Sequence, residues 1–547
     1  MPRSNKQLHQ WNEPVAPRPA ATVLLVRDAE SGFEVLMTRR SSAASFAPGA
    51  FVFPGGALDQ ADASPEAGAL SLARETQSDE QRAFSIAAIR EAFEELGVLL
   101  AYRADGSLAD STDVKRLERA GRDFLAQIGQ FGYRLAVDQV WWLCHWITDR
   151  DLPKRFDARF FVARMPQGQV PVADEGETFE PVWVAPADAL ARHARGEFEM
   201  IFPTIRTLRR LAGIPTVQDL LAACTTERPL FLSCPRAGRI NGAVERFSEH
   251  ELPYGELELV APDGRVVHSL DWQHEQPVQL LSNVRRLTAP NPGRMTGPGT
   301  NTYIVGEPGA YAVIDPGPDV PAHIERIAAL VGDGLRYILC THAHPDHAPG
   351  AAPLREITGA PILGAPSGPH FRSEWAFVPE RTLVDGERLS LGDTTLRVLH
   401  TPGHASNHLC FLLEEDRLLL SGDHINNGST VVIDPPDGNM AAYLVALERL
   451  LTEPFDYILP AHGWVLGFAH DAIRQLIAHR MGREAKVLAA LRNAPGATVE
   501  ELVPPVYKEV DRMLYPVAAR SLLAHLEKLL ADGMAAVEDD RWRALEG

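Results

Sequence analysis

The seven residues "THAHPDH", from Thr341 to His347, place three histidines and one aspartate directly after the apolar run "YILC". Imidazole nitrogens and carboxylate oxygens together are suitable ligands for zinc or a similar transition ion such as Mn²⁺ or Fe²⁺. Alternate side chains of an extended segment point to the same side, so His342 and His344 can share one ion. Asp346 and His347 follow around the next turn, where we expect them to face a second ion.

Each of these ions needs further ligands, and three polar residues later in the chain can supply them. His404 lies in "TPGH", Asp423 in "SGD" and His462 in "PAHG", each after a short apolar strand. The predicted ligand sets are His342, His344 and His404 for one ion, Asp346, His347 and His462 for the other, with Asp423 as a bridge. Two ions about 3.5–4 Å apart polarise a substrate and lower the pKa of bound water to about 7, and Asp346 can orient that water as a catalytic residue.

In this order, "THAHPDH", "TPGH", "SGD" and "PAHG" resemble the motifs of the metallo-β-lactamase superfamily, and "GTNTYIVG" and "IDPG" match its opening strands. The resemblance covers residues 281–478 and implies an αββα sandwich with a two-metal site at one edge. Residues 479–547 are mostly helical and end in "MAAVEDDRWRAL", which predicts a two-stranded wing. This resembles the lactamase-beta-like 2 branch, whose members carry a C-terminal winged helix and include an RNA endonuclease and thioesterases. His408, His424 and His479 match no ligand position, and we expect them to pack or to support the ligands.

A second group of carboxylates lies in "REAFEELG", residues 90–97. Glu91, Glu94 and Glu95 recur at spacings of three and four residues, so in a helix they share one face. Three neighbouring carboxylates repel one another, and a hard divalent cation such as Mg²⁺ or Mn²⁺ removes that repulsion while it bridges to substrate phosphates. The alternative is a solvated acidic face. Arg90 can pair with one of the carboxylates.

The region around this helix resembles the Nudix hydrolases, whose signature runs from a glycine loop into a helix with the pattern R-E-x-x-E-E-x-G. Arg90, Gly97 and the three glutamates match the helix, and Gly55 and Gly56 match the loop. A long insertion separates the two, as in the Nudix type 19 branch, so the glutamate that usually follows the glycines is not identifiable. The resemblance implies an α/β/α sandwich in which water attacks a diphosphate, with Glu94 and Glu95 as catalytic metal ligands.

The stretch "LMTRRSSAASFAPGAFVFPGG" resembles the coenzyme A signature of certain Nudix enzymes. The matching residues are Thr38, Arg40, Ser41, Gly49, Phe53 and Pro54. The sequence departs from this signature at Met37, where leucine is usual, and at Ser45, where arginine is usual. The second departure removes a charge that contacts phosphate. Glu177, six residues before Trp183, is a candidate general base for this half of the chain.

The hydrophobic pattern divides the 547 residues into several domains of an α/β protein. The predicted divisions are a loose tail over 1–20, a Nudix-like domain over 21–215, a bridge over 216–280, a metallo-β-lactamase-like domain over 281–478 and a winged-helix-like domain over 479–547. Within the bridge, "GELELVAPDGRVVHSL" predicts a hairpin around "PDG".

The composition restricts the partners. A net charge of −19 argues against a long nucleic-acid footprint, which needs basic surface. A narrow RNA channel needs fewer basic contacts, so RNA stays an unfavoured alternative to a small-molecule substrate. Five scattered cysteines without a CxxC pair indicate a reducing compartment. With neither a signal-peptide pattern nor a membrane-spanning apolar run, we expect a cytoplasmic protein that binds no membrane. The sequence does not indicate an oligomeric state.

Three functions are compatible with these patterns. The first is a bifunctional hydrolase, in which a two-zinc head cleaves thioesters or esters and a Nudix head cleaves a diphosphate, with coenzyme A derivatives or nucleoside diphosphate derivatives as substrates. The second is a metal-dependent endoribonuclease or phosphodiesterase with a nucleotide-binding Nudix half. The third is a regulatory module in which the Nudix half only senses a ligand.

Overall fold

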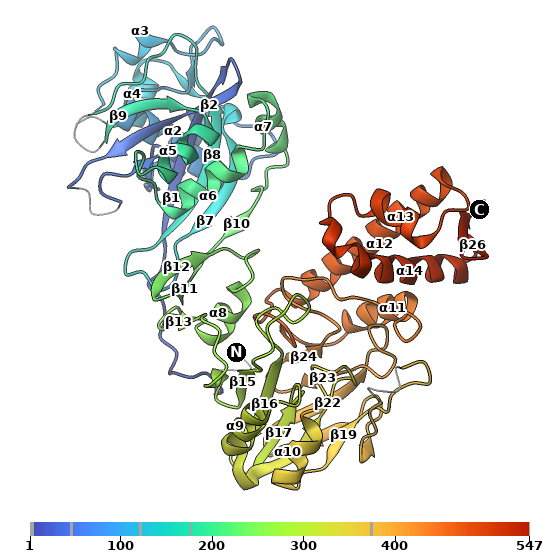
Figure 1. The fold of residues 1–547 in the computed structure, drawn as a ribbon. Helices are drawn as coiled ribbons and strands as arrows, with labels where there is room; N and C mark the ends of the chain where they lie inside the picture. Colours follow the sequence, from blue (N-terminus) through green and yellow to red (C-terminus); the bar gives the residue numbers. More distant parts are fainter. Residues whose placement is uncertain (1–4, 44–46, 120–122, 175–177, 372–375, 546–547) are drawn as a thin grey trace. The chain divides into compact units, whose positions relative to one another are not determined.

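The computed structural model of this chain describes residues 5–43, 47–119, 123–174, 178–371 and 376–545. It contains two compact units, which are coloured along the chain in Figure 1. One unit is Pro14–Pro235, and the other combines Met1–Glu13 with Arg236–Gly547. The Nudix-like region is therefore inserted between a short N-terminal segment and the rest of the C-terminal unit.

The unit Pro14–Pro235 is built on an eight-stranded mixed sheet with the order β10-β7-β8-β1-β2-β3, in which β4 also pairs with β1 and β9 with β2. Its strands are β1 Arg18–Ala29, β2 Gly32–Arg40, β3 Phe51–Val52, β4 Gly55–Ala57, β7 Trp141–Ile147, β8 Phe156–Arg164, β9 Thr178–Val184 and β10 Leu232–Ser233, and a small sheet pairs β5 Ala101–Tyr102 with β6 Arg134–Leu135. Its helices are α1 Pro65–Ala69, α2 Asp79–Leu96, α3 Ser111–Val114, α4 Phe124–Gln130, α5 Pro186–Ala194, α6 Phe202–Leu211 and α7 Val217–Ala223, with short 3₁₀ turns η1 Ala61–Ala63 and η2 Val137–Gln139.

Both faces of this sheet are covered by helices. Side chains along β1 alternate between two cores, because successive residues of a strand point to opposite faces. Val23 and Leu25 pack with α2, whereas Leu24 and Val26 pack with α6 and α7. The result is the α/β/α sandwich that the sequence predicts. Helix α2 is closed at both ends by its own sequence, with a capping box at Ser78 and a left-handed glycine at Gly97.

The larger unit contains two sheets packed face to face. The first has the order β14-β15-β16-β17-β18-β19-β20 and the second β21-β22-β23-β24-β25. The strands of the first are β14 Val278–Leu281, β15 Val284–Thr288, β16 Asn301–Glu307, β17 Ala310–Ile314, β18 Leu335–Leu339, β19 Ile362–Gly364 and β20 Arg381–Thr382. Those of the second are β21 Arg388–Ser390, β22 Thr395–His400, β23 Leu409–Leu413, β24 Leu418–Gly422 and β25 Tyr457–Pro460.

Helices cover the outer face of each of these sheets. One core lies between the sheets, a second lies under α9 and α10, and a third lies under α11 and the first turns of α12. The helices are α9 Pro321–Val331, α10 Ala351–Thr358, α11 Met440–Leu450 and α12 Ala469–Asn493, with a 3₁₀ turn η3 at Gly332–Gly334. This arrangement is the predicted αββα sandwich.

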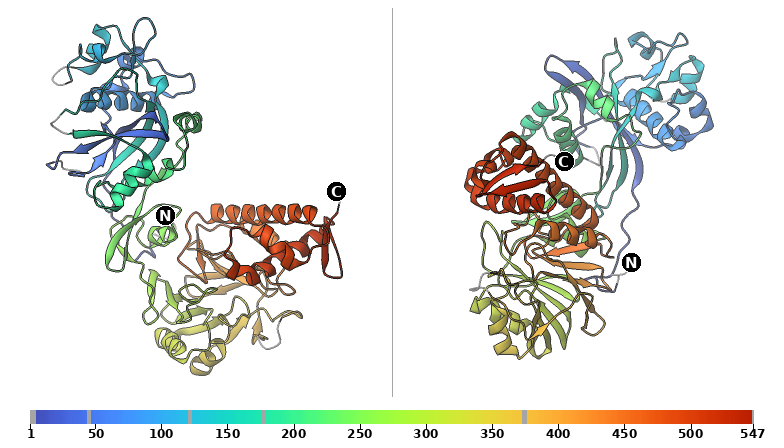
Figure 2. Two further views of the ribbon diagram at one scale, coloured as in Figure 1. Left: turned by 45° about the horizontal axis from the view of Figure 1, so that its top comes forward. Right: turned by 90° about the vertical axis from the view of Figure 1, so that its right-hand side faces the viewer.

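The long helix α12 continues from the sandwich into a C-terminal bundle, and Figure 2 shows it as one unbroken helix. The bundle consists of α13 Val499–Val506, the 3₁₀ turn η5 Arg512–Leu514, α14 Tyr515–Ala531 and the hairpin of β26 Ala535–Glu538 with β27 Arg541–Ala544. It has a core of its own, which includes Leu502, Leu522 and Trp542. The predicted wing is present. In the described part of the chain, no helix combines the length and apolarity that crossing a membrane requires.

The segment that the sequence assigns to a bridge divides between the two units at Pro235 and Arg236. The predicted hairpin around "PDG" is wrong, because "YGELELV" forms the helix α8, Tyr254–Val260. The hairpin of this region lies earlier, where β11 Arg236–Ile240 pairs with β12 Ala243–Phe247 around Asn241 and Gly242, and β13 His268–Ser269 completes the sheet. Both turn residues have positive φ, which Asn-Gly pairs accommodate well.

The N-terminal segment is held more tightly than a loose tail. The amide of Ser282 donates to the Lys6 carbonyl (2.8 Å), which adds this segment to the edge of the larger unit. His9 Nε2 lies 3.0 Å from the carboxylate of the buried Asp263, and the Asn12 amide donates to the same carboxylate at 3.0 Å. A buried carboxylate needs such partners, so this polar stretch becomes ordered against it.

Candidate functional site

Four strand ends of the αββα sandwich bring the predicted metal ligands together. "THAHPDH" follows β18, His404 follows β22, Asp423 follows β24 and His462 follows β25. Strand ends position polar side chains at one edge of a sheet while the strands themselves remain in the apolar core. All seven predicted ligands belong to groups of possible metal donors whose ligand atoms lie within 4.8 Å of one another.

The first group consists of three imidazoles. His342 Nε2 lies 2.9 Å from His344 Nδ1, and His404 Nε2 lies 3.0 Å from the same atom. Burial lowers the pKa of His342 and of His404 and brings that of His344 to about 3. The three rings are therefore neutral, which is the form in which imidazole binds a metal ion.

The second group combines imidazoles with carboxylates. Asp346 Oδ2 lies 3.2 Å from His347 Nε2 and 3.3 Å from His462 Nε2. Asp423 lies between the two groups, because its carboxylate oxygens are 3.2 Å from His462 Nε2, 3.7 Å from His347 Nε2 and 3.6 Å from His404 Nε2. This position is compatible with the bridging role that the sequence predicts for Asp423.

The electrostatics of the second group differ from those of the first. Against the effect of burial, the charges of Asp346 and Asp423 raise the pKa of His347, and Asp423 brings that of His462 to about 10. The same imidazoles hold the pKa of Asp346 and of Asp423 below the usual range, again against burial. Two ionised carboxylates in a buried site are thus a strong attractor for positive charge.

Hydrogen bonds fix which ring nitrogen of His342, His347 and His404 faces the other candidate ligands. His347 Nδ1 donates to Asp315 (3.0 Å), and His404 Nδ1 donates to the Val432 carbonyl (2.7 Å). Thr341 Oγ1 donates to Asp315 (2.8 Å) and can accept from His342 Nδ1 (2.9 Å). In each of these three rings Nε2 is then the nitrogen that faces the candidate ligands, which is the arrangement that metal-binding histidines require.

The donor set fits a pair of transition ions. It offers imidazoles and carboxylates in two clusters, and Asp423 lies within 3.7 Å of imidazoles of both. His347 Nε2 is buried and lacks a well-aligned hydrogen-bond partner in the described part of the chain, although its other nitrogen is satisfied. A cation bound between the carboxylates would give this buried nitrogen the partner that it lacks.

The three histidines that the sequence assigns to packing or to support of the ligands lie outside these groups. His408 is buried, and its Nε2 accepts from the Asp423 amide (3.2 Å), so it supports the bridging residue. His424 is also buried, and its carbonyl accepts from the Tyr443 hydroxyl (2.8 Å). His479 is exposed on α12.

Sequence reasoning missed the residues that support the His462 loop. The side-chain amide of Asn301 donates to the carbonyls of Pro460 (3.0 Å) and Gly463 (2.9 Å), and the Tyr303 hydroxyl donates to Pro460 as well (2.8 Å). Both side chains belong to "GTNTYIVG". A polar Asn at the start of an otherwise apolar strand was the available signal.

In the Nudix unit, α2 carries the three predicted glutamates beside the glycine loop. A Cβ on Gly56 would lie 2.4 Å from Glu91 Oε1, so only glycine lets this loop approach the helix. The Gly55 amide donates to Glu95 (3.3 Å), and Arg90 donates to Glu91 (2.7 Å) and Glu94 (3.0 Å). The three carboxylates therefore face one loop and one arginine.

Arg90 has a further partner, Asp62, which the sequence did not indicate. Its buried carboxylate accepts two hydrogen bonds from the Arg90 guanidinium, at 3.1 and 3.0 Å, and the Ala57 carbonyl accepts a third at 2.9 Å. Asp62 lies six residues after Gly56, within the inserted segment that separates the glycine loop from the helix. The insertion hides this pairing from the sequence because it separates two residues that meet in space.

Burial raises the pKa of Glu91 to about 6 and also raises that of Glu94. Carboxylates in this state gain from a cation, which is consistent with the predicted Mg²⁺ or Mn²⁺ site. The donor groups within 4.8 Å of one another, among the residues that the structure describes, do not include these glutamates. Glu177, the predicted general base, and Ser45 lie outside the described residues.

Several residues of the coenzyme A signature have structural partners. Thr38 is buried and donates to the Phe179 carbonyl (2.9 Å), and Phe53 packs edge-on against Phe160. Gly49 has a φ of +74°, which favours glycine. Arg40 is the basic residue among those that match the signature. Its Nε is buried and has no hydrogen-bond partner among the described residues.

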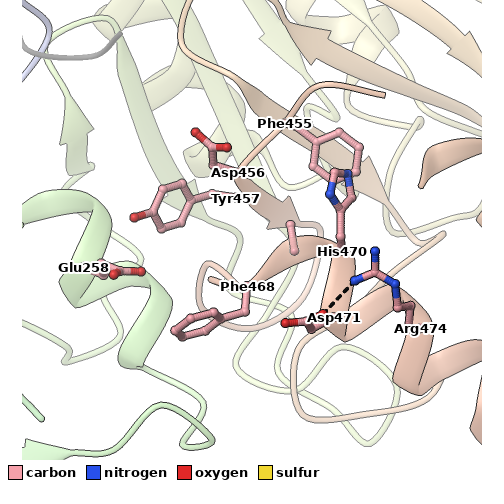
Figure 3. A pocket seen from close by; sticks show the side chains of 9 residues that line it. Glu258, Phe455, Asp456, Tyr457, Phe468, His470, Asp471 and Arg474 are labelled. Atoms are coloured by element: carbon pink, nitrogen blue, oxygen red, sulfur yellow. Dashed lines mark hydrogen bonds and ion pairs between the residues drawn. The ribbon is translucent and has the colours of Figure 1, made fainter. Parts of the chain in front are cut away.

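The larger unit also contains a hollow of about 430 Å³, which is drawn in Figure 3. Its lining residues are Glu258, Phe455, Asp456, Tyr457, Phe468, Ala469, His470, Asp471 and Arg474. Its carboxylates are paired: Asp471 with Arg474 (2.7 Å), Asp456 with Arg417 (2.9 Å) and Glu258 with Arg236 (3.7 Å). None of the seven metal-ligand candidates lines it, and its balanced charges indicate no chemistry.

Comparison with known proteins agrees with this division. The metallo-beta-lactamase superfamily model matches residues 295–462, the beta-lactamase associated winged helix domain matches 498–542, and the NUDIX domain matches 16–202. The lactamase-like protein GME11357 of Pestalotiopsis microspora is 32% identical over 289 residues, which cover 48% of this chain and 86% of that protein. The atrochrysone carboxyl ACP thioesterase dmxR1 of a Cryptosporiopsis species is 30% identical over 278 residues, which cover 48% of this chain and 83% of that protein.

Among solved structures, a NUDIX hydrolase from Alicyclobacillus acidocaldarius is 28% identical, with a TM-score of 0.35, and the match covers 38% of this chain and 96% of that one. The family matches indicate a hydrolase. The chain belongs to the metallo-β-lactamase superfamily and carries in addition an N-terminal Nudix domain and a C-terminal winged-helix domain. The predicted order of domains and their fold classes are confirmed.

Proposed function

We propose that the αββα sandwich is a two-metal hydrolase of thioesters and that the Nudix domain hydrolyses a diphosphate. The position of Asp423 carries the first part of this proposal. One carboxylate lies within 3.7 Å of imidazoles from both donor groups, a geometry suited to bridging two ions. Zinc fits the donor types best, with Mn²⁺ or Fe²⁺ as alternatives.

Two ions bound here would supply Lewis acidity and an activated water. The residues of the chain have separate tasks. The imidazoles His342, His344 and His404 hold the first position, and His347 and His462 hold the second. Asp346 is ionised, lies within 3.3 Å of His347 Nε2 and His462 Nε2 and accepts a hydrogen bond from Thr300 Oγ1 (3.3 Å), so it can orient the attacking water.

Two observations support a thioester as the substrate of this domain. One relative, which matches 48% of the chain, is named as an atrochrysone carboxyl ACP thioesterase. The Nudix domain carries most of a coenzyme A signature, including Thr38, Arg40 and Gly49. Acyl carrier proteins and coenzyme A present their thioesters on the same phosphopantetheine arm, so one chain could act on that arm at two bonds.

For the Nudix domain we infer a divalent cation, Mg²⁺ or Mn²⁺, held by Glu91, Glu94 and Glu95. Arg90 anchors two of these carboxylates to Asp62 and so fixes their positions on α2. Water would add to one phosphorus of the diphosphate, the bridging P–O bond would break, and two phosphorylated products would leave. The base for that water is proposed as Glu177.

A hydrolysis screen tests this division of labour. Acyl-coenzyme A, free coenzyme A, ADP-ribose and a short RNA are offered to the wild type, to Glu95→Gln and to Asp346→Ala. We expect Asp346→Ala to lose thioester cleavage and keep diphosphate cleavage, and Glu95→Gln to show the opposite. Loss of the same activity in both variants would contradict two independent sites. Cleavage of RNA without cleavage of thioesters would contradict the thioesterase and favour a ribonuclease.

The five free cysteines are consistent with a reducing compartment, and we propose a cytoplasmic location for the reaction.

A further inference from the structure

The segment 431–439 connects the C-terminal helices to the candidate metal ligand His404. Val431 and Ile433 point into the core beneath α11, which also contains Ala524 of α14. Between them, the carbonyl of Val432 accepts the hydrogen bond from His404 Nδ1 at 2.7 Å. The ring that faces the metal centre is therefore held from behind by this segment.

Two further hydrogen bonds from the same segment hold the backbone on either side of His404. The Asn439 amide donates to the Gly403 carbonyl (2.7 Å), and the Ser406 amide donates to the Asp437 carboxylate (3.0 Å). A Cβ on Gly403 would lie 2.4 Å from Tyr443 of α11, so the backbone here lies directly against that helix. The position of His404 thus depends on where the segment 431–439 lies.

Arg480 fixes that segment from the other side. It lies on α12, is only 4% exposed, and donates through Nη2 to the carbonyl of Val431, the residue before Val432. Its guanidinium also lies over the Tyr443 ring, 5.3 Å from the centroid. Arg480 and His404 therefore bind two neighbouring carbonyls of one short stretch. A weaker, exposed contact joins Arg520 of α14 to Asp434 (3.4 Å).

We propose that Arg480 is a positioning residue for the metal centre, acting through the Val431–Val432 peptide on the ring of His404. The inference rests on the proposed function, since it takes His404 to be a metal ligand. Its physical basis is that the carbonyl partner of a ligating imidazole sets the ring's orientation and tautomer. A displaced Val432 carbonyl leaves His404 Nε2 without a fixed direction. The helix that leads into the winged-helix domain then takes part in metal binding.

The test measures the affinity of the apoprotein for Zn²⁺ by competition with a chromophoric chelator, independently of catalysis. Arg480→Met keeps the length and the apolar stem of the side chain but removes its donors. We expect it to weaken the binding of one of the two ions by about 10–100-fold. Arg474→Met is the matched control and should leave both affinities unchanged. Arg474 is exposed on the same helix, and among the residues that the structure describes its ion pair is with Asp471.

A double-mutant cycle with His404→Ala separates positioning from a general loss of stability. If Arg480 acts through His404, adding Arg480→Met to His404→Ala costs no further affinity. An equal loss in both backgrounds, or no loss from Arg480→Met alone, would overturn the proposal. Should Arg480→Met fail to fold, Arg480→Lys keeps one donor for Val431 and should bind Zn²⁺ with an affinity below that of the wild type; wild-type affinity would overturn the inference. If His404→Ala itself binds two ions normally, the proposed metal site fails instead.

Discussion

At the scale of single residues, the metal centre depends on side chains that bind no ion. Asn301 is fully buried and divides its amide between the carbonyls on either side of His462. Its Oδ1 accepts from Thr288 Oγ1 (3.0 Å), so its orientation is fixed as well. The loop that carries His462 therefore has its backbone held in place before any ion binds.

Replacing Asn301 with alanine should weaken Zn²⁺ binding by about 10–100-fold, as loss of a residue that orients a ligand commonly does. It should also lower the free energy of unfolding by about 1–3 kcal/mol, because the Gly463 and Pro460 carbonyls each lose a hydrogen bond from a buried donor. Chelator competition and urea unfolding measure the two effects. Asn283→Ala is the control: Asn283 is equally buried but bonds to Asp416, so it should lose stability and keep its metal affinity. Equal affinities in the two variants would contradict this role.

A second residue-scale prediction concerns the Nudix loop. Gly56→Ala places a methyl group 2.4 Å from Glu91 Oε1, so loop and helix must separate. We expect loss of diphosphate hydrolysis, unchanged thioester hydrolysis, and a destabilisation of about 1–3 kcal/mol from overpacking. Gly68→Ala is tolerated by comparison, since its nearest neighbour is the flexible end of Arg82 at 3.4 Å. Full diphosphatase activity in Gly56→Ala would show that the close approach is unnecessary.

The candidate ligands could be selected from the sequence because their chemical types occur in compact motifs at strand ends. Their partners could not. Asp315 stands in "IDPG" and Asp62 in an unremarkable acidic loop, and nothing local shows that one orients His347 while the other holds Arg90. Such pairings depend on distances between segments far apart in the chain, which residue types alone do not specify.

At the scale of elements, helix α8 shows how a buried ion pair overrides a local pattern. "GELELVAPDG" alternates like a strand before a turn, yet it folds as a helix that buries Glu256. The carboxylate of Glu256 pairs with Arg286 Nη2 (3.0 Å) and His268 Nε2 (3.0 Å) and accepts from the Val465 amide (3.3 Å). Val465 lies three residues after His462, so this helix also braces the metal-site loop.

This pairing predicts a pH dependence of stability. Against the effect of burial, Arg286 and His268 lower the pKa of Glu256 from 4.5 to about 2. Because the pKa is lowered on folding, the stabilisation is complete above pH 4.5 and is lost as the pH falls from 4.5 towards 2. Unfolding of the larger unit, followed by urea titration at each pH, should show this decline.

Glu256→Gln should remove that part of the pH dependence. At neutral pH it should destabilise the larger unit by about 3–5 kcal/mol, because Arg286 is left buried without a counter-charge. Glu258→Gln, two residues along the same helix and partly exposed, should change little. A Glu256→Gln variant with wild-type stability and the same acid profile would refute the role assigned to this ion pair.

At the scale of the whole molecule, the order of domains could be predicted, because each domain has its own motifs and its own pattern of apolar residues. The division between the compact units was less predictable. It falls at Pro235 and Arg236, and residues before Pro14 belong with the C-terminal unit. Asp263 is the reason: it is buried in that unit and takes its partners from His9 and Asn12. No local pattern links residues about 250 positions apart.

Deleting residues 1–13 should therefore destabilise the C-terminal unit and not the Nudix domain that follows directly in the sequence. We expect a loss of about 1–3 kcal/mol, because the Asp263 carboxylate is left buried with fewer donors. Hydrogen exchange should speed up at Ser282, whose amide loses the Lys6 carbonyl, while the amides of β1 keep their protection. Faster exchange confined to the Nudix domain would contradict this assignment.

We propose that histidines and aspartates from four strand ends bind two transition ions around Asp423. Elemental analysis of protein loaded with Zn²⁺ and freed of excess metal tests it most directly, with Asp423→Ala as the comparison. We expect two zinc ions per wild-type chain and at most one per chain of the Asp423→Ala variant. A wild type that retains no zinc, or an Asp423→Ala variant that retains two ions as firmly as the wild type, would contradict it.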